Sequence, residues 1–334
     1  MTTVRDALLA GVGGASETHD AFQIRDALVE GTRAVDVFGV IMELGIPLQF
    51  APLDGLLGAC LRVDETTVGI LITTQRDLHM QRFTAAHELG HFVLQHEGSL
   101  DREVRFPGNT KNRDLREVEA DAFAAEFLMP KWLVGAVANR HGWWSVPRLS
   151  DPSTVYQLSL RLALSYEATC WGLASHSCIN NLIARALVET APKESKLRLL
   201  EGVPLEDPWA DVWQLDEHDN GASLDAGPRD LLVLRLKERV GAGYSWDTDA
   251  VMAAGFLVLE DRSEIESRAV GAASTRRLVL RVPGPGTYDL RLAQRRRFSP
   301  KAAPVESFRV SVSTYGARKA GTYAASTSSP LVLH

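Results

Sequence analysis

The sequence has no long apolar run, few cysteines and no signal-peptide pattern. No stretch of about 18 or more uninterrupted apolar residues occurs, so we expect no membrane-spanning helix. The first residues, MTTVRDALLAGVGG, lack a basic start and carry an acid at Asp6, which argues against a secretory signal. The three cysteines, Cys60, Cys170 and Cys178, are odd in number and widely spread, which excludes a disulfide framework. The expected compartment is therefore the cytoplasm.

An excess of positive charge is also missing. Lysine and arginine number 36 against 42 aspartates and glutamates, a net charge of −6. This balance gives no general electrostatic reason to bind DNA, RNA or anionic lipid, so we expect neither nucleic acid nor membrane as a partner. What the chain does contain is ordinary for a globular protein: 334 residues, 45% of them hydrophobic and 23% charged. That length suits about two domains, each with its own core.

The first half of the chain has mainly helical periodicity. Apolar residues recur at helical spacing from Ala21 to about Gly45, and two short β-like runs follow, around 57–63 and 67–73. Further helices are predicted over 82–96 and about 115–128, with more helix to about Val188. We therefore expect a mainly helical domain with a small β-sheet over residues 21–188, after a flexible leader over 1–20.

Beyond about residue 210 the periodicity changes from helical to two. Tyr288, Leu290 and Leu292 alternate with polar residues, and several other short strands are separated by glycine and proline turns. This pattern favours a β-sandwich over residues 211–316. The proline-rich segment 189–210 is the expected linker, and residues 317–334 the expected flexible tail. The fold class predicted for the whole chain is α+β.

The most informative segment is His87-Glu88-Leu89-Gly90-His91, a His-Glu-x-x-His motif. Positions i and i+4 lie on one face of a helix, so His87 and His91 can both direct an imidazole at one Zn²⁺, at about 2.0–2.1 Å. Glu88 is close enough to reach a metal-bound water, which is the geometry for metal-assisted hydrolysis. The competing interpretation is a surface helix with two incidental histidines.

A second acidic helix supplies candidates for a third ligand. Glu117 and Asp121 are four residues apart and share a face, whereas Glu119 lies about 200° from Glu117 around the helix. Our interpretation makes Glu117 the ligand and Asp121 an acceptor for the remaining N–H of a ligand histidine. Glu119 is the alternative metal ligand. Two histidines and one carboxylate leave the fourth zinc position open for water, as a catalytic site requires.

These two motifs together resemble the ImmA/IrrE family of zinc metallo-endopeptidases. Arg82-Phe83-Thr84 leads into the histidine motif, and Glu-x-Glu-Ala-Asp-x-Phe-Ala-Ala-Glu-Phe-Leu-Met-Pro begins at Glu117. The resemblance covers roughly residues 21–185, with Asp121 standing where asparagine is common. It implies a gluzincin-like fold, one Zn²⁺ held by two histidines and a glutamate, and cleavage of a helix-turn-helix repressor in phage, mobile-element or stress circuits.

The mechanism expected for such a site uses Glu88 as general base. Glu88 would take the proton of the zinc-bound water and pass it to the leaving amine. A further donor should stabilise the oxyanion. Four residues are candidates for that donor, and the sequence does not choose among them: His96, His141, Tyr156 and Tyr166.

The second domain resembles chagasin-like inhibitors of cysteine peptidases. The similar segments are Gly243-Tyr244-Ser245-Trp246, the glycine turn and strand from Gly284 to Leu292, the basic-aromatic run Arg296-Arg297-Phe298, and the strand 308–312. The resemblance implies an immunoglobulin-like sandwich whose loops, including Gly243, Tyr244, Arg296 and Arg297, could bind a partner. The family's Asn-Pro-Thr-Thr is replaced by Arg239–Ala242 and its Pro-Trp is absent, so we expect the sandwich rather than the inhibition. Trp246 is expected in the core.

Three functions from different classes follow. The first is a zinc endopeptidase that cuts a regulatory protein. The second is a zinc-holding module that binds a partner without cutting it. The third is a cysteine-peptidase inhibitor that acts through the C-terminal loops. A Glu88→Gln variant separates the first two, and titration against a papain-like enzyme tests the third.

Overall fold

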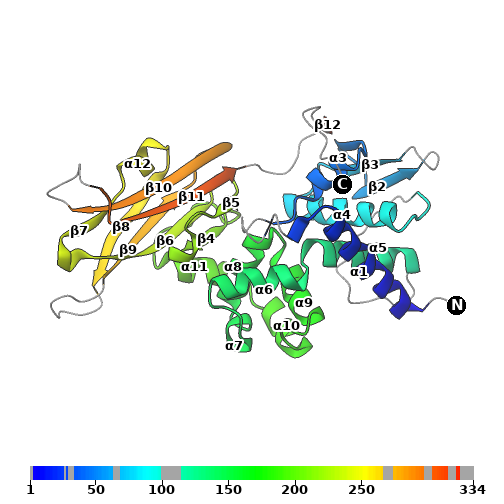
Figure 1. Ribbon diagram of the computed structural model, residues 1–334, viewed down its shortest axis with the longest axis horizontal. Coiled ribbons are helices and arrows are strands. Elements are labelled where there is room, and N and C mark those ends of the chain that lie inside the picture. Colours follow the sequence, from blue (N-terminus) through cyan, green and yellow to red (C-terminus); the bar gives the residue numbers. More distant parts are fainter. Residues whose placement is uncertain are drawn as a thin grey trace. The chain divides into compact units, whose positions relative to one another are not determined.

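The computed structural model describes residues 3–25, 28, 34–62, 68–98, 114–265, 274–296, 303–314 and 321–323 (Figure 1). The chain divides into two compact units. The described residues up to Val134, together with 321–323, form the first unit, and those from Gly135 to Thr314 form the second. Within the described ranges, no helix has the length and apolar character needed to cross a membrane.

The first unit contains a four-stranded sheet. Its strands are β1 (Leu48–Ala51), β2 (Gly58–Arg62), β3 (Val68–Thr73) and β12 (Gly321–Tyr323), in the order β12-β1-β3-β2. β1 is parallel to β3, and the other two pairs are antiparallel. β2 and β3 match the two β-like runs seen in the sequence. Of the tail expected to be flexible over 317–334, the structure describes only 321–323, which form β12 and pair with β1; the rest of that prediction lies outside the described residues.

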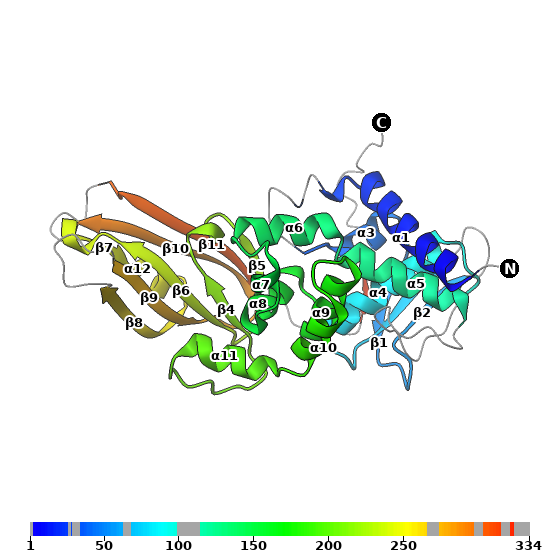
Figure 2. The ribbon, with the colours of Figure 1, turned by 90° about the horizontal axis from the view of Figure 1, so that it is seen from below.

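The first unit also contains helices. They are α1 (Val4–Ala21), α3 (Val37–Glu43), α4 (Leu78–Val93) and α5 (Leu115–Leu128). α1 occupies the segment expected as a flexible leader over 1–20, and it lies along α5 (Figures 1 and 2). The small residues of this segment explain the difference. A Cβ at Gly11 would collide with the backbone of Glu119, so the absent side chain lets the two helices pack closely. The helix expected from Ala21 to Gly45 is also different, since residues 34–36 between α1 and α3 are not helical.

The second unit combines helices with two sheets. Its helices are α6 (Lys131–Arg140, which begins before the division), α7 (Val146–Leu149), α8 (Pro152–Leu162), α9 (Tyr166–Ser175), α10 (Asn181–Val188), α11 (Pro192–Leu200) and α12 (Asp249–Ala253). Its strands are β4 (Val212–Leu215), β5 (Ser223–Asp225), β6 (Leu231–Glu238), β7 (Tyr244–Asp247), β8 (Leu257–Ile265), β9 (Ser274–Arg281), β10 (Gly286–Arg296) and β11 (Glu306–Thr314).

These strands form a β-sandwich. One sheet has the order β5-β11-β10-β7 and the other β4-β6-β9-β8. A single apolar cluster draws side chains from both sheets, among them Leu234 on β6, Leu292 on β10 and the expected core residue Trp246 on β7. The first four residues of β6, Leu231–Leu234, form an uninterrupted apolar run, and all four are buried. This pattern is typical of a strand that is covered on both faces. Its residues Leu232 and Leu234 face the sandwich core, whereas Leu231 and Val233 belong to a second cluster.

That second cluster includes α11, which corrects the linker expected over 189–210. Pro192 stands in the first turn of α11, where its missing N–H costs nothing. Leu200, at the end of α11, belongs to the same apolar cluster as Val233 of β6. Arg277, fully buried on β9, donates hydrogen bonds to the carbonyls of Leu199 and Leu200 at 3.0 and 2.9 Å. The prolines of this segment therefore begin a helix that covers the sheet.

Helix α8 covers the edge of the same sheet. β4 is an edge strand, and the side-chain amide of Gln157 donates to the carbonyl of Val212 and accepts from the N–H of Gln214, both at 2.7 Å. Arg161, one turn later, donates to the carbonyl of Gln214 at 2.7 Å. These side chains satisfy backbone groups that a neighbouring strand would otherwise pair with. Helix α8 is therefore packed as part of the same unit as the sandwich.

Candidate metal centre

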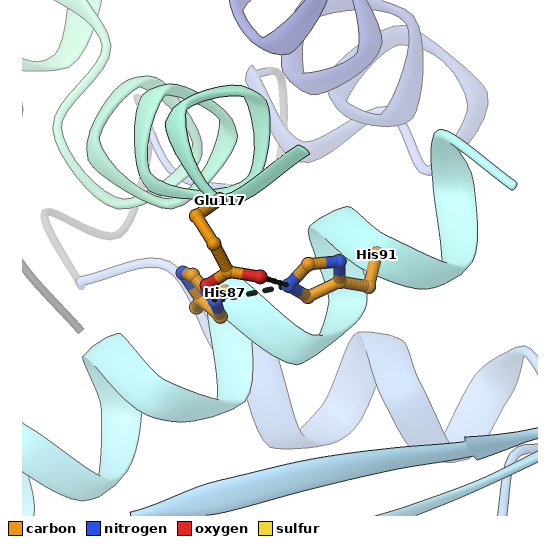
Figure 3. Close-up of side chains that lie close together, drawn as sticks. All are labelled: His87, His91 and Glu117. Atoms are coloured by element: carbon orange, nitrogen blue, oxygen red, sulfur yellow. Dashed lines mark hydrogen bonds and ion pairs between the residues drawn. The ribbon is translucent and has the colours of Figure 1, made fainter. Parts of the chain in front are cut away.

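Helix α4 presents the two histidines of the motif side by side. Asp77 caps the start of the helix by accepting a hydrogen bond from the N–H of Met80, and every residue from Gln81 to His91 is buried. The Nε2 atoms of His87 and His91 are 3.0 Å apart, with 0% and 2% of the two side chains exposed. Figure 3 shows both rings reaching from one face of α4. Two buried imidazoles in this arrangement are not an incidental surface feature.

Glu117, in the first turn of α5, completes a three-donor group. Its Oε2 lies 3.4 Å from Nε2 of His87 and its Oε1 lies 3.6 Å from Nε2 of His91 (Figure 3). Ligands at about 2.0–2.1 Å around a tetrahedral ion lie roughly 3.4 Å from one another. The three donors therefore fit zinc. The Glu117 side chain is 26% exposed, which leaves this side of the group open to solvent.

The close approach of α4 and α5 depends on Gly90. A Cβ at this position would lie 3.1 Å from the side chain of Phe123 on α5, so a larger residue would push the helices apart. Glu117 can reach the histidines because this gap is small. The glycine inside the His-Glu-x-x-His motif thus helps α5 to bring Glu117 close to the two histidines.

The other two candidate acids of α5, Asp121 and Glu119, each lie beside a ring nitrogen of a histidine. Asp121 accepts a hydrogen bond from Nδ1 of His87 at 2.9 Å. Glu119 is directed elsewhere: its Oε2 lies 2.7 Å from Nε2 of His96. Glu117 and Asp121 therefore lie at the histidine pair, as the helical spacing suggested, and Glu119 lies outside the three-donor group.

The surroundings of the two imidazoles shift their pKa values in opposite directions. Burial alone would lower the pKa of His87, but hydrogen bonds to Asp121 and Glu117 outweigh it and raise that pKa to about 10. At His91, burial and the neighbouring charge of His87 lower the pKa to about 3. A metal ion that binds both imidazoles must therefore displace one proton, from His87.

Glu88 is fully buried one residue along α4 from the first histidine. Its negative charge acts on His87, where it favours the protonated imidazole. The carboxylate faces Gly58 on β2, where a Cβ would lie 2.5 Å from Oε1 and from the methyl group of Thr84. Sequence reasoning missed Gly58, because nothing in the residues around it indicates that β2 crosses beside Glu88.

The four oxyanion candidates fall in different places. His96 contacts Nδ1 of His91 through its own Nδ1, at 2.8 Å. The other three belong to the second unit. There the Tyr156 hydroxyl donates to Asp211 at 2.8 Å, the Tyr166 hydroxyl donates to the carbonyl of Leu187 at 3.2 Å, and His141 accepts a hydrogen bond from Arg161. Each of these three has a structural partner within that unit.

The candidate partner-binding loops lie at the β7 and β10 ends of the sandwich. Gly243 adopts a left-handed conformation with φ of 79°, and Tyr244 begins β7. The guanidinium of Arg296 lies over the Tyr244 ring, 5.1 Å from its centroid. Arg297 lies outside the described residues. The aromatic and basic residues singled out in the sequence therefore contact each other.

Comparison with known proteins adds the family. Residues 41–173, which contain all three candidate ligands and Glu88, match the family model Peptidase_M78, the IrrE N-terminal-like domain. This segment is similar to the IrrE N-terminal-like domain. Residues 226–312 match the chagasin family of peptidase inhibitors, I42. The IrrE-like match suggests a metallopeptidase and hence a metal cofactor, for which His87, His91 and Glu117 form a possible site.

Two solved structures are similar to part of this chain. One is the cysteine protease inhibitor EhICP2 from Entamoeba histolytica, with 25% identity, covering 33% of this chain and 100% of that one at a TM-score of 0.28. Another is amebosin, with 18% identity, covering 31% of this chain and 98% of that one at a TM-score of 0.26. No curated protein matches the chain.

Proposed function

We propose that the chain is a zinc-dependent endopeptidase with a gluzincin-like catalytic domain, which hydrolyses a peptide bond in a regulatory protein. The observation that carries this proposal is the convergence of His87, His91 and Glu117 from two helices, with donor spacings of 3.0, 3.4 and 3.6 Å. Three protein ligands leave a fourth position for water or substrate, which distinguishes a catalytic zinc site from a structural one.

Each residue has a distinct part in this proposal. His87, His91 and Glu117 would hold the ion, which when bound lowers the pKa of water and polarises a carbonyl group. Glu88 would take a proton from the attacking water and return it to the leaving amine. Its burial beside β2 keeps bulk water away from the carboxylate and holds it in one orientation. Asp121 would fix the ring of His87 through the 2.9 Å hydrogen bond to Nδ1.

The proposed substrate is a helix-turn-helix transcriptional repressor, and the proposed setting is a phage, mobile-element or stress response in the cytoplasm. This part of the proposal rests on the likeness of residues 41–173 to the IrrE N-terminal-like domain. The partly exposed Glu117 is consistent with a site that a protein segment can reach from solvent.

The test combines metal content with cleavage. Purified protein should carry one zinc per chain, and it should cut the helix-turn-helix repressor encoded nearest to its gene at a single peptide bond, identified by mass spectrometry. Glu88→Gln should keep the zinc and lose the cleavage, because it removes the base but no ligand. A chain without stoichiometric metal, or a Glu88→Gln variant that cuts normally, would refute the proposal.

The same experiment separates the binding alternative. If wild-type protein and Glu88→Gln both bind the repressor tightly, leave it intact and relieve repression equally, the chain is a zinc-holding binding module. The presence of a buried carboxylate next to the first ligand favours hydrolysis, since a module that only binds has no need of Glu88.

A further inference from the structure

Helix α4 ends in a backbone motif that returns the chain to His91. The N–H of His96 donates to the carbonyl of His91 at 2.9 Å, and the N–H of Gln95 donates to the carbonyl of Phe92 at 3.1 Å. Gln95 is left-handed, with φ of 58°. This combination is a Schellman motif, in which the residue after the left-handed position contacts the residue five places earlier. The contact is usually apolar, but here it joins two imidazoles.

His96 links a candidate zinc ligand to a carboxylate. Its Nδ1 lies 2.8 Å from Nδ1 of His91, and its Nε2 lies 2.7 Å from Oε2 of Glu119. The His96 side chain is 7% exposed and that of Glu119 is 18% exposed. Both hydrogen bonds therefore lie largely away from water, where a polar group without a partner is costly.

The direction of this chain of hydrogen bonds follows from its last member. A carboxylate only accepts, so Nε2 of His96 donates its proton to Glu119. Neutral His96 then carries a lone pair on Nδ1, which accepts the Nδ1 proton of His91. With its proton on Nδ1, His91 directs the Nε2 lone pair toward His87 and Glu117, as a metal ligand must.

We propose that His96, held by Glu119, is a positioning residue that fixes the tautomer and the ring orientation of His91 in the metal centre. His96 accepts the Nδ1 proton of His91, as Asp121 accepts the Nδ1 proton of His87. Glu119, the alternative ligand of the sequence interpretation, is in this account the anchor of His96. The proposal rests on the proposed function in one respect only, which is that the three-donor group binds zinc.

The test measures zinc affinity by competition with a chromophoric chelator, and the visible spectrum of the Co²⁺-substituted protein. His96→Leu removes the acceptor and should weaken zinc binding about 10- to 100-fold and shift the Co²⁺ bands. His96→Asn places an amide oxygen near the former Nδ1 and should restore most of the affinity. Asp121→Ala removes the acceptor of His87 and gives a reference value for the loss of zinc affinity. Glu97→Ala is the surface control, because the Glu97 side chain is 93% exposed.

Two results would overturn the proposal: His96→Leu that binds zinc like the wild type, or His96→Asn that is as weak as His96→Leu. If His96→Leu does not fold, Glu119→Leu decides, with weaker zinc binding expected and unchanged affinity contradicting the idea. These readouts do not require peptidase activity. A chain that binds no zinc would refute both proposals. Normal cleavage by Glu88→Gln would refute the proposed function alone, and unchanged zinc affinity in His96→Leu would refute the role of His96 alone.

Discussion

The backbone of Gly58 faces the carboxylate of Glu88, and a Cβ at position 58 would lie 2.5 Å from its Oε1. The position of the Glu88 carboxylate, our proposed general base, thus depends on a glycine on a different element, the strand β2. The same Cβ would also lie 2.5 Å from the methyl group of Thr84, so both the Glu88 and the Thr84 side chains would have to move to accommodate it. A substitution at position 58 is therefore expected to displace the Glu88 carboxylate without removing it.

Gly58→Ala should displace the Glu88 carboxylate and lower kcat about 10- to 100-fold, because general-base efficiency depends on hydrogen-bond reach to the water. Zinc content should stay at one per chain, since no ligand changes. The measurement is single-turnover cleavage with zinc analysis of the same sample. Gly69→Ala on β3 is the matched control, because a Cβ there has only the carbonyl of Pro47 at 3.8 Å nearby. Normal cleavage by Gly58→Ala would contradict this role.

Gln157→Ala should destabilise the second unit by about 2–4 kcal/mol. It removes the partner of the Val212 carbonyl and of the Gln214 N–H on the edge strand β4, and each unsatisfied buried group costs about 1–3 kcal/mol. Urea denaturation followed by tryptophan fluorescence reports the change, because Trp213 lies on β4. Gln49→Ala, at an exposed position on β1, should change stability little. Equal stability of both variants would show that α8 does not support the sheet edge.

The stability of the second unit should fall as the pH drops from about 6.5 to about 4. Burial and the charge of Arg161 lower the pKa of His141 to about 4, whereas unfolded histidine titrates near 6.5. Between these values the unfolded chain binds the proton and the folded one does not. The free energy of unfolding of the second unit is therefore highest above about pH 6.5. It falls by up to about 3 kcal/mol as the pH drops toward 4.

The histidine's contribution can be isolated by substitution. His141→Gln keeps an acceptor for Arg161 but does not titrate, so its unfolding free energy should depend less on pH than that of the wild type. His176→Gln is the matched control. An unchanged pH dependence in His141→Gln would assign the fall to other groups.

Titration of the protein against a papain-like peptidase should show no tight inhibition, with any Kd above about 1 μM. Residues 226–312 match the chagasin family, but Tyr244 is covered by Arg296, and Arg239–Ala242 replace that family's Asn-Pro-Thr-Thr. A chagasin-family inhibitor is the positive control. Stoichiometric inhibition would instead support the inhibitor hypothesis for the C-terminal domain.

Local sequence patterns predicted most of the elements that carry the site. The histidine motif and the acidic segment were expected as helices over 82–96 and 115–128, and they form α4 (Leu78–Val93) and α5 (Leu115–Leu128). The strands β2 and β3 were also expected. Helical spacing depends only on the residues within one element, so a single sequence is enough to place His87 and His91 on one face.

The failures lie where packing overrides local composition. The segment 1–20 is small and polar enough to suggest a leader, yet its glycines allow α1 to pack against α5. The prolines of 189–210 suggest a linker, yet Pro192 begins a helix that covers β6. In both cases the deciding contact is with a residue far away in the sequence, which local patterns do not contain.

The sequence by itself determined which groups the site can offer: two imidazoles one helical turn apart, a carboxylate beside them, and the three candidate acids Glu117, Glu119 and Asp121 near the start of a second helix. Only the tertiary structure decided which acid serves which nitrogen. Glu117 and Glu119 lie about 200° apart around α5, and the helical period cannot say which of them faces α4. The packing of α5 against Gly90 and Gly11 fixes that rotation, and so directs Glu117 to His87 and His91 and Glu119 to His96.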